Sequence, residues 1–153
     1  MKSTENDEMA VDVLLVEDSA GDVRLTQEAF RAYGKPVRLH LAADGIEAMA
    51  FLRREGIYAN VPRPDLILLD LNLPKMDGRE VLALIKTDQD LKIIPTIILT
   101  TSDDEADVMI SYQLQANCYL RKPARWDAFD SLVRSINAFW LTRAKLPQQI
   151  QNV

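Results

Sequence analysis

The chain has 153 residues, of which 48% are hydrophobic and 27% charged, and its formal net charge is −5. These values are typical of one globular domain, and they lack the basic surface of a general nucleic-acid binder. One cysteine excludes an internal disulfide, and no apolar run approaches the roughly 20 residues of a membrane span. We expect a cytoplasmic protein, without nucleic-acid or membrane partners, whose segments are a flexible acidic leader (1–9), one domain (10–143) and a C-terminal tail (144–153).

Short apolar runs alternate with helix-like segments five times along the chain. The runs that predict strands lie at residues 11–16, 37–43, 66–69, 96–100 and 118–120. Helices are expected at about 20–33, 46–54, around 81–85, at 104–115 and at 125–143. This alternation predicts an α/β fold, in which a parallel sheet carries helices on both faces.

The second predicted strand differs from the others in its pattern. Val37, Leu39 and Leu41 alternate with Arg38 and His40, whereas the first, third and fourth strands are nearly continuous apolar runs. A strand with one wet face belongs at the edge of a sheet, so we expect His40 to face solvent. The pattern predicts a doubly wound, flavodoxin-like, five-stranded parallel sheet of order 2-1-3-4-5.

Polar side chains follow four of the predicted strands. Glu17 and Asp18 follow the first strand, Asp70 the third, Thr100 ends the fourth, and Lys122 follows the fifth. In such sheets the ligand site lies outside the carboxyl ends of the strands, so these groups should meet in one cleft.

Three carboxylates in one cleft need a physical reason. Two carboxylates about 4 Å apart repel by roughly 4 kcal/mol at an effective dielectric near 20, but a hard divalent cation such as Mg²⁺ makes them favourable neighbours. The pattern therefore predicts magnesium-assisted handling of a phosphoryl group. Asp70 would be the nucleophile, while Lys122 and the Thr100 hydroxyl would contact the phosphoryl oxygens.

Simpler interpretations remain for the same residues. Asp18 and Ser19 could both cap the helix that begins near residue 20, and Lys122-Pro123 could form an ordinary turn. Asp77-Gly78 indicates a turn and a helix start. These interpretations explain each motif alone but not their combination.

The motif Asp65-Leu-Ile-Leu-Leu-Asp70-Leu-Asn-Leu-Pro74-Lys-Met-Asp77-Gly78, together with the residues above, resembles the receiver domain of two-component response regulators. The resemblance spans about residues 11–142. It implies that Asp70 accepts a phosphoryl group from a phosphohistidine of a sensor histidine kinase, with Thr100 and Lys122 on the phosphoryl oxygens. It also implies Mg²⁺, for which Mn²⁺ or Ca²⁺ can substitute, held by Glu17, Asp18, Asp70 and the backbone carbonyl of Asn72.

The resemblance further implies a conformational switch. In this family Thr100 would be drawn toward the phosphoryl group, and Tyr119 would rotate inward into the vacated space. The chain would then be a signalling phosphoacceptor rather than an enzyme. Its output would pass through protein contact or through a phosphotransfer protein downstream.

A narrower resemblance concerns stand-alone regulators paired with bacterial and cyanobacterial phytochrome kinases. It rests on the motifs Leu99-Thr-Thr-Ser102, Asn117-Cys-Tyr-Leu120 and Ala138-Phe-Trp140. The apolar stripe of the last helix ends in Phe139 and Trp140, which we expect to extend beyond the core that the helix covers. We expect these two residues to form a homodimer contact, as exposed apolar patches often do.

Two other functions fit parts of the pattern. A haloacid-dehalogenase-like phosphohydrolase also uses an aspartyl nucleophile, but carries it on the first strand with a second acid two residues later, where this chain has Asn72. A flavodoxin-like binding protein shares the strand order, but Glu17, Asp18 and Asp22 would repel its cofactor phosphate.

Overall fold

The computed structural model describes residues 10–147, and the leader 1–9 and residues 148–153 of the tail lie outside the described residues. The strands are β1 (Val11–Val16), β2 (Val37–Ala42), β3 (Leu66–Leu69), β4 (Thr96–Thr100) and β5 (Cys118–Arg121). The helices are α2 (Ala20–Ala32), α3 (Gly45–Arg53), α4 (Gly78–Thr87), α5 (Glu105–Gln113) and α6 (Trp126–Ile136), with a 3₁₀ turn η1 (Gly56–Tyr58) and a π-helical segment η2 (Asn137–Arg143). No helix in this described part is long and apolar enough to cross a membrane.

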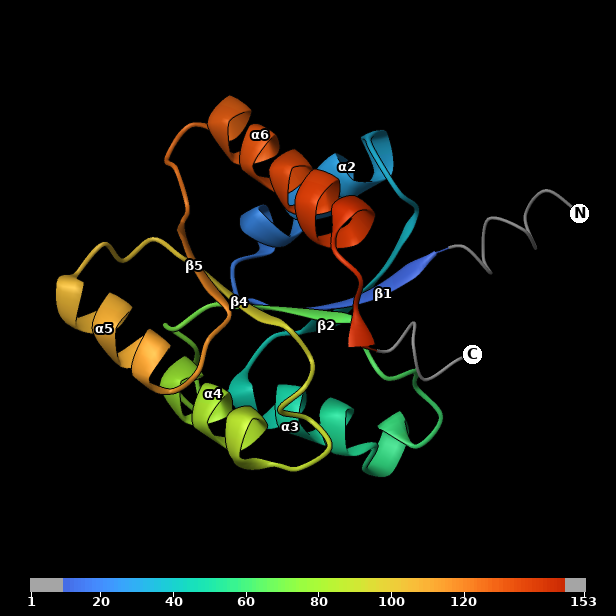
Figure 1. Cartoon of the computed structure of the whole chain (residues 1–153), viewed down its shortest axis with the longest axis vertical. Coiled ribbons are helices and arrows are strands. Elements are labelled where there is room, and N and C mark those ends of the chain that lie inside the picture. Colours follow the sequence, from blue (N-terminus) through green and yellow to red (C-terminus); the bar gives the residue numbers. More distant parts are fainter. Residues whose placement is uncertain (1–9, 148–153) are drawn as a thin grey trace, which may run out of the picture.

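The five strands form one parallel sheet of order β2-β1-β3-β4-β5, which confirms the predicted fold and strand order. Helices α2 and α6 cover one face of the sheet, and α3, α4 and α5 lie on the other (Figure 1). Both faces of the central strands are therefore buried, which explains why β1, β3 and β4 are mostly apolar.

The core consists of two apolar clusters, one on each face of the sheet. The cluster on the α3 and α4 side includes Leu14, Val16, Ile67, Leu69 and Ile98. The cluster on the α2 and α6 side includes Val13, Leu15, Leu66, Leu68 and Ile97. Successive residues of each strand thus point to opposite faces, and the resulting rigid sheet fixes where each strand ends.

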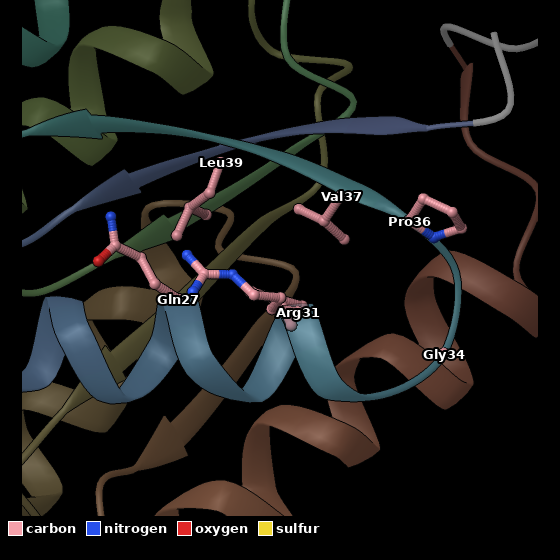
Figure 2. Close-up of a pocket in the computed structure, with 7 residues that line it drawn as sticks. Gln27, Arg31, Gly34, Pro36, Val37 and Leu39 are labelled. Carbon is pink, nitrogen blue, oxygen red and sulfur yellow. The ribbon is translucent and has the colours of Figure 1, made fainter. Parts of the chain in front are cut away.

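On the edge strand β2, the face that carries the apolar residues is the one that α2 covers. Val37 and Leu39 point from β2 toward α2, where Gln27 and Arg31 complete the wall of a groove of about 440 Å³ (Figure 2). Leu41 is the exception in the predicted pattern, since it is 40% exposed.

The expectation that His40 faces solvent is wrong. Its Nε2 lies 3.0 Å from Oδ1 of Asp12 on the neighbouring strand, and its ring packs at 5.4 Å from the ring of Phe51 on α3. The reason is that α3 covers this face of β2, which the pattern of a single strand does not show.

The last predicted helix changes its type part-way. It is α-helical to Ile136 and π-helical from Asn137 to Arg143. The Asn137 Oδ1 accepts a hydrogen bond from the backbone N–H of Lys35 at 3.0 Å, and its Nδ2 donates to the Lys35 carbonyl at 3.0 Å. Gly34 has a φ of 78°, and a Cβ at Gly34 would collide with the Asn137 side chain. Asn137 therefore ties the C-terminal segment to the turn before β2.

Packing continues past the expected domain end at residue 143. Leu146 is buried in the cluster on the α2 and α6 side. Residues 144–147 of the expected tail thus include a side chain that belongs to the core.

Candidate functional site

Glu17 and Asp18 lie directly after β1. The backbone N–H of Glu17 donates to the Ala42 carbonyl at 2.9 Å, which continues the strand pairing by one residue and holds Glu17 in a buried position. Asp18 is exposed. The cap of α2 is Ser19, whose hydroxyl accepts the N–H of Asp22 at 3.3 Å, so Asp18 is available for another role.

Asp70 is buried at the end of β3 and is positioned by its backbone neighbours. Its N–H donates to the Val16 carbonyl at 3.1 Å, and its Oδ1 accepts the N–H of Asn72 at 3.2 Å. Gly78 begins α4 so close to the Asp70 carbonyl that a Cβ there would collide with it. Asp77 caps α4 by accepting the N–H of Arg79 at 2.9 Å, as the turn prediction for Asp77-Gly78 stated.

The buried ammonium of Lys122 joins the separate strand ends. Its backbone N–H donates to the Thr100 carbonyl at 2.7 Å, which holds it beside β4. Its Nζ lies 2.8 Å from Glu17 Oε1 and 3.0 Å from Asp70 Oδ2. Side chains that are 52 and 105 residues distant from Lys122 in the sequence thus meet at one atom.

The sequence indicated Asp22 beside Glu17 and Asp18, but its contact with Lys122 was not predicted. Its Oδ2 lies 2.9 Å from the Nζ of Lys122. The available signal was its place in the first turn of α2, directly after the acidic pair, because a first turn that follows a strand end faces the same cleft.

The pKa values show how crowded the carboxylates are. Burial raises the pKa of Glu17 to about 8, and its neighbour Asp70 adds to this effect against the opposing attraction of Lys122. Burial also acts to raise the pKa of Asp70, but the hydrogen bond with Glu17 and the charge of Lys122 outweigh it and lower that pKa. Burial opposes the charge of Lys122, yet the contacts with Glu17 and Asp22 raise its pKa. The crowding of these carboxylates therefore favours the binding of a proton or a cation at Glu17.

The residues present fit a divalent cation. Glu17, Asp18 and Asp70 each offer a carboxylate oxygen, and these oxygens lie within 4.8 Å of one another. The Oε2 of Glu17 is buried and has no hydrogen-bond partner. A hard cation bound by several oxygens satisfies this atom and relieves the repulsion. The part that the Asn72 carbonyl would take in such a site stays a prediction.

Thr100 and Tyr119 lie on neighbouring strands beside this cluster. Thr100 is fully buried, and its Oγ1 has no hydrogen-bond partner. The half-buried Tyr119 donates its hydroxyl hydrogen to the Ser102 carbonyl at 2.8 Å. The hydroxyl of Ser102 donates to Asp107 at 2.6 Å, and Asp107 also pairs with Arg79 at 2.6 Å. The loop after β4 is thus linked to both α4 and β5.

The predicted dimer residues lie away from this cluster. Phe139 is 56% exposed, and its ring contacts that of Trp140 edge to face at 5.4 Å. They line an apolar groove of about 400 Å³, together with Cys118 and Leu120 of the edge strand β5 and with residues of α6. Cys118 is half-buried, because it lines this groove.

The comparisons with known proteins agree with this geometry. The response regulator receiver domain family matches residues 13–134. The chain belongs to this family. The family assignment favours a receiver over the phosphohydrolase and the flavodoxin-like binding protein that the sequence also suggested.

Similar proteins include regulators linked to phytochromes. This receiver is 53% identical to the response regulator Rcp1 of Synechocystis sp. over 135 residues, which are 88% of this chain and 92% of Rcp1. It is 52% identical to the phosphorylated cyanobacterial phytochrome response regulator RcpA, with a TM-score of 0.88 over 90% of this chain and 99% of that one. The Mn²⁺-bound form of Rcp1 superposes with a TM-score of 0.86, at 52% identity and with the same coverage. The resemblance to receivers and to phytochrome-linked regulators is thereby confirmed.

Proposed function

We propose that this receiver takes a phosphoryl group on Asp70 from a phosphohistidine of a sensor histidine kinase and passes the signal on by protein contact. The observation that carries the proposal is the placement of Lys122, whose ammonium contacts both Asp70 and Glu17 beside the exposed Asp18. A buried acceptor carboxylate, a cation and a set of metal ligands are the groups that phosphoryl transfer needs.

The reaction follows from these groups. A carboxylate oxygen of Asp70 forms a bond to phosphorus while the bond between phosphorus and the donor imidazole nitrogen breaks, and the imidazole keeps that electron pair. Lys122 offsets the charge of the phosphoryl oxygens, and the unpaired hydroxyl of Thr100 donates a hydrogen bond to one of them. Glu17, Asp18, Asp70 and the Asn72 carbonyl would hold Mg²⁺, which would neutralise further charge on the phosphoryl group.

Incubation with Mg²⁺ and acetyl phosphate tests the proposal. The intact mass of the protein should rise by one phosphoryl group, and Asp70→Asn should abolish the increase, because an amide cannot replace the acceptor carboxylate. Asp127→Asn, which removes an exposed carboxylate of α6 that pairs with Arg125, is the matched control and should leave the increase intact. An unmodified wild-type mass, or one that Asp70→Asn does not change, would contradict the proposal.

The switch is proposed on the same structure. The phosphoryl group would draw the Thr100 hydroxyl toward it, and the space left behind would favour a further inward position of the Tyr119 ring. The bond from Tyr119 to the Ser102 carbonyl supports this proposal, because it couples the ring to the loop that follows Thr100. A local change of charge would thereby bias a two-state element at the surface of α5 and β5.

The partner is proposed to be a phytochrome-type histidine kinase in the cytoplasm. The similarity to RcpA, a cyanobacterial phytochrome response regulator, supports this. We propose a signalling acceptor rather than an enzyme that turns over an external substrate, and output by contact or by a downstream phosphotransfer protein. Phosphotransfer profiling against purified kinases tests the partner: a phytochrome kinase should phosphorylate Asp70 faster than unrelated kinases.

We also propose a homodimer through the groove that Phe139 and Trp140 line. Support comes from its apolar walls and from the exposure of Phe139 beside an edge strand. Burial of such a surface against a second copy removes apolar area from water, which is the main driving force of association.

A further inference from the structure

A small pocket lies at the end of the sheet opposite to Asp70. It has a volume of about 220 Å³ and lies between the end of α3 and the loop that follows α4. These segments precede β3 and β4, whereas the acidic cluster follows β1 and β3 (Figure 1). The pocket is therefore separate from the phosphoacceptor site.

Three arginines line this pocket, Arg53, Arg54 and Arg63. None of the three side chains makes a hydrogen bond or an ion pair within residues 10–147. The Nε of Arg63 is buried and has no hydrogen-bond partner. An unpaired buried donor is costly, and reorientation of the Arg63 side chain toward an acceptor in the pocket would remove this cost.

Arg54 adds a second observation. It caps α3 in the left-handed conformation with a φ of 57°, a position that glycine or asparagine occupies more readily. Attraction to the negative end of α3 explains a basic residue in its last turn, which is Arg53. It does not explain why a second arginine holds the strained position or why a third arrives from the loop before β3.

The acidic residues at the pocket do not match this charge. Asp88 and Asp90 line it, but Oδ1 of Asp88 accepts the backbone N–H groups of Asp90 at 2.8 Å and Leu91 at 3.0 Å. Those two bonds, followed by the charges of Arg53 and Arg63, lower the pKa of Asp88. The pocket therefore has three arginines and two aspartates, and one of these aspartates, Asp88, already closes a turn. This local excess of positive charge contrasts with the net charge of −5 of the whole chain.

We propose that this pocket binds a phosphate group, held by the guanidinium forks of Arg54 and Arg63 with Arg53 at the rim. Guanidinium presents parallel N–H donors that match two oxygens of a phosphate. The pocket volume of about 220 Å³ is large enough to admit a phosphate group. The ligand is either free phosphate or the terminal phosphate of a nucleotide.

Amide NMR of the metal-free protein tests the proposal. Sodium phosphate should shift the signals of Arg53, Arg54, Arg63 and residues 88–91 along a saturable curve, in comparison with sodium chloride at the same ionic strength. Arg63→Gln should weaken binding about tenfold, the loss expected for one charge-assisted hydrogen bond. Arg54→Gly should do the same while it relieves the strained backbone, so loss of folding cannot explain the result.

Arg24→Gln is the matched control, because Arg24 is an exposed arginine of α2 that pairs with Glu28. It should leave phosphate binding unchanged, and phosphorylation of Asp70 should be normal in all three arginine variants. A titration with ADP distinguishes the sources: equal affinity identifies free phosphate, and tighter binding through the same signals identifies a nucleotide. Shifts that sodium chloride reproduces, or saturable shifts that neither Arg54→Gly nor Arg63→Gln weakens, would overturn the proposal.

Discussion

Lys122 stabilises a cluster of carboxylates that would otherwise repel one another. Its ammonium contacts Glu17, Asp22 and Asp70 at 2.8 to 3.0 Å, and Asp18 adds a further negative charge beside them. One cation among four carboxylates leaves an excess of negative charge. A divalent cation is the complement that this excess favours.

Asp18→Asn is the substitution that tests this balance of charge. The metal-free variant should melt slightly higher than the wild type, because one repelling carboxylate is gone. Mg²⁺ should raise the melting temperature of the wild type, since it binds the folded form, but not that of Asp18→Asn. Thermal unfolding with and without Mg²⁺ measures both effects.

Glu28→Gln serves as the control, since it removes an exposed carboxylate of α2 that pairs with Arg24. It should keep the full response to Mg²⁺. A variant Asp18→Asn that is destabilised and still responds to Mg²⁺ would show that the metal ligands are assigned wrongly.

Asp12 lies near the amino end of β1, opposite to the acidic site, and its ionisation makes the folding stability depend on pH. Burial acts to raise its pKa, but hydrogen bonds from His40 and Arg38 outweigh this and lower it to about 2. A lowered pKa stabilises the folded state above the ordinary value of 3.8, and that contribution disappears as the pH falls toward 2. The contribution near neutral pH is about 2 kcal/mol.

Urea unfolding of the wild type and Asp12→Asn at several pH values measures this contribution. The wild type should be more stable than the variant at pH 6, and the difference should shrink as the pH falls from about 4 toward 2. A difference that stays constant over this range would refute the assigned pairing of Asp12.

At the scale of elements, the sequence predicted those features that depend on local patterns of apolar and polar residues. The apolar runs located all five strands, and the wet face of β2 placed it at the edge. The π-helical segment η2 was not predictable, because it follows from the docking of Asn137 on a turn about 100 residues earlier. The contact of His40 with Asp12 and the contact of Asp22 with Lys122 escaped prediction for the same reason.

Asn137→Ala tests the docking of η2. Asn137 is 2% exposed, and its loss leaves the N–H and the carbonyl of Lys35 without their partner. The free energy of unfolding should fall by about 1–3 kcal/mol, as expected for buried polar groups that lose their hydrogen bonds. Urea denaturation measures the change.

The matched control for this substitution is Ser135→Ala, which removes an exposed hydroxyl of α6 that bonds only locally to the Ser131 carbonyl. Its free energy of unfolding should change little. If Asn137→Ala and Ser135→Ala were equally stable, the side chain of Asn137 would not hold the C-terminal segment in place.

At the scale of the whole molecule, the sheet separates three surfaces. The acidic site lies at the carboxyl ends of the strands, the arginine-lined pocket lies at their amino ends, and the apolar groove of Phe139 and Trp140 follows the edge strand β5. The first surface was predicted from motif residues that follow strands. The arginine-lined pocket was not predicted, because Arg53, Arg54 and Arg63 belong to no recognisable motif.

Analytical ultracentrifugation tests the proposed homodimer. The wild type should sediment as a dimer, and Phe139→Lys should sediment as a monomer, because a charge in the groove opposes burial. Ile57→Lys is the control, since Ile57 is an 89% exposed apolar residue outside the groove, and it should remain dimeric. A wild type that stays monomeric at every concentration would refute the dimer.

The identity of the phosphorylated side chain tests the central claim most directly. After phosphorylation with Mg²⁺ and acetyl phosphate, borohydride reduction converts an aspartyl phosphate to homoserine, which peptide mass spectrometry locates. The structure predicts homoserine at position 70 and an unmodified aspartate at position 18. Modification at any other position, with Asp70 intact, would contradict the assignment of the buried carboxylate beside Lys122 as the acceptor.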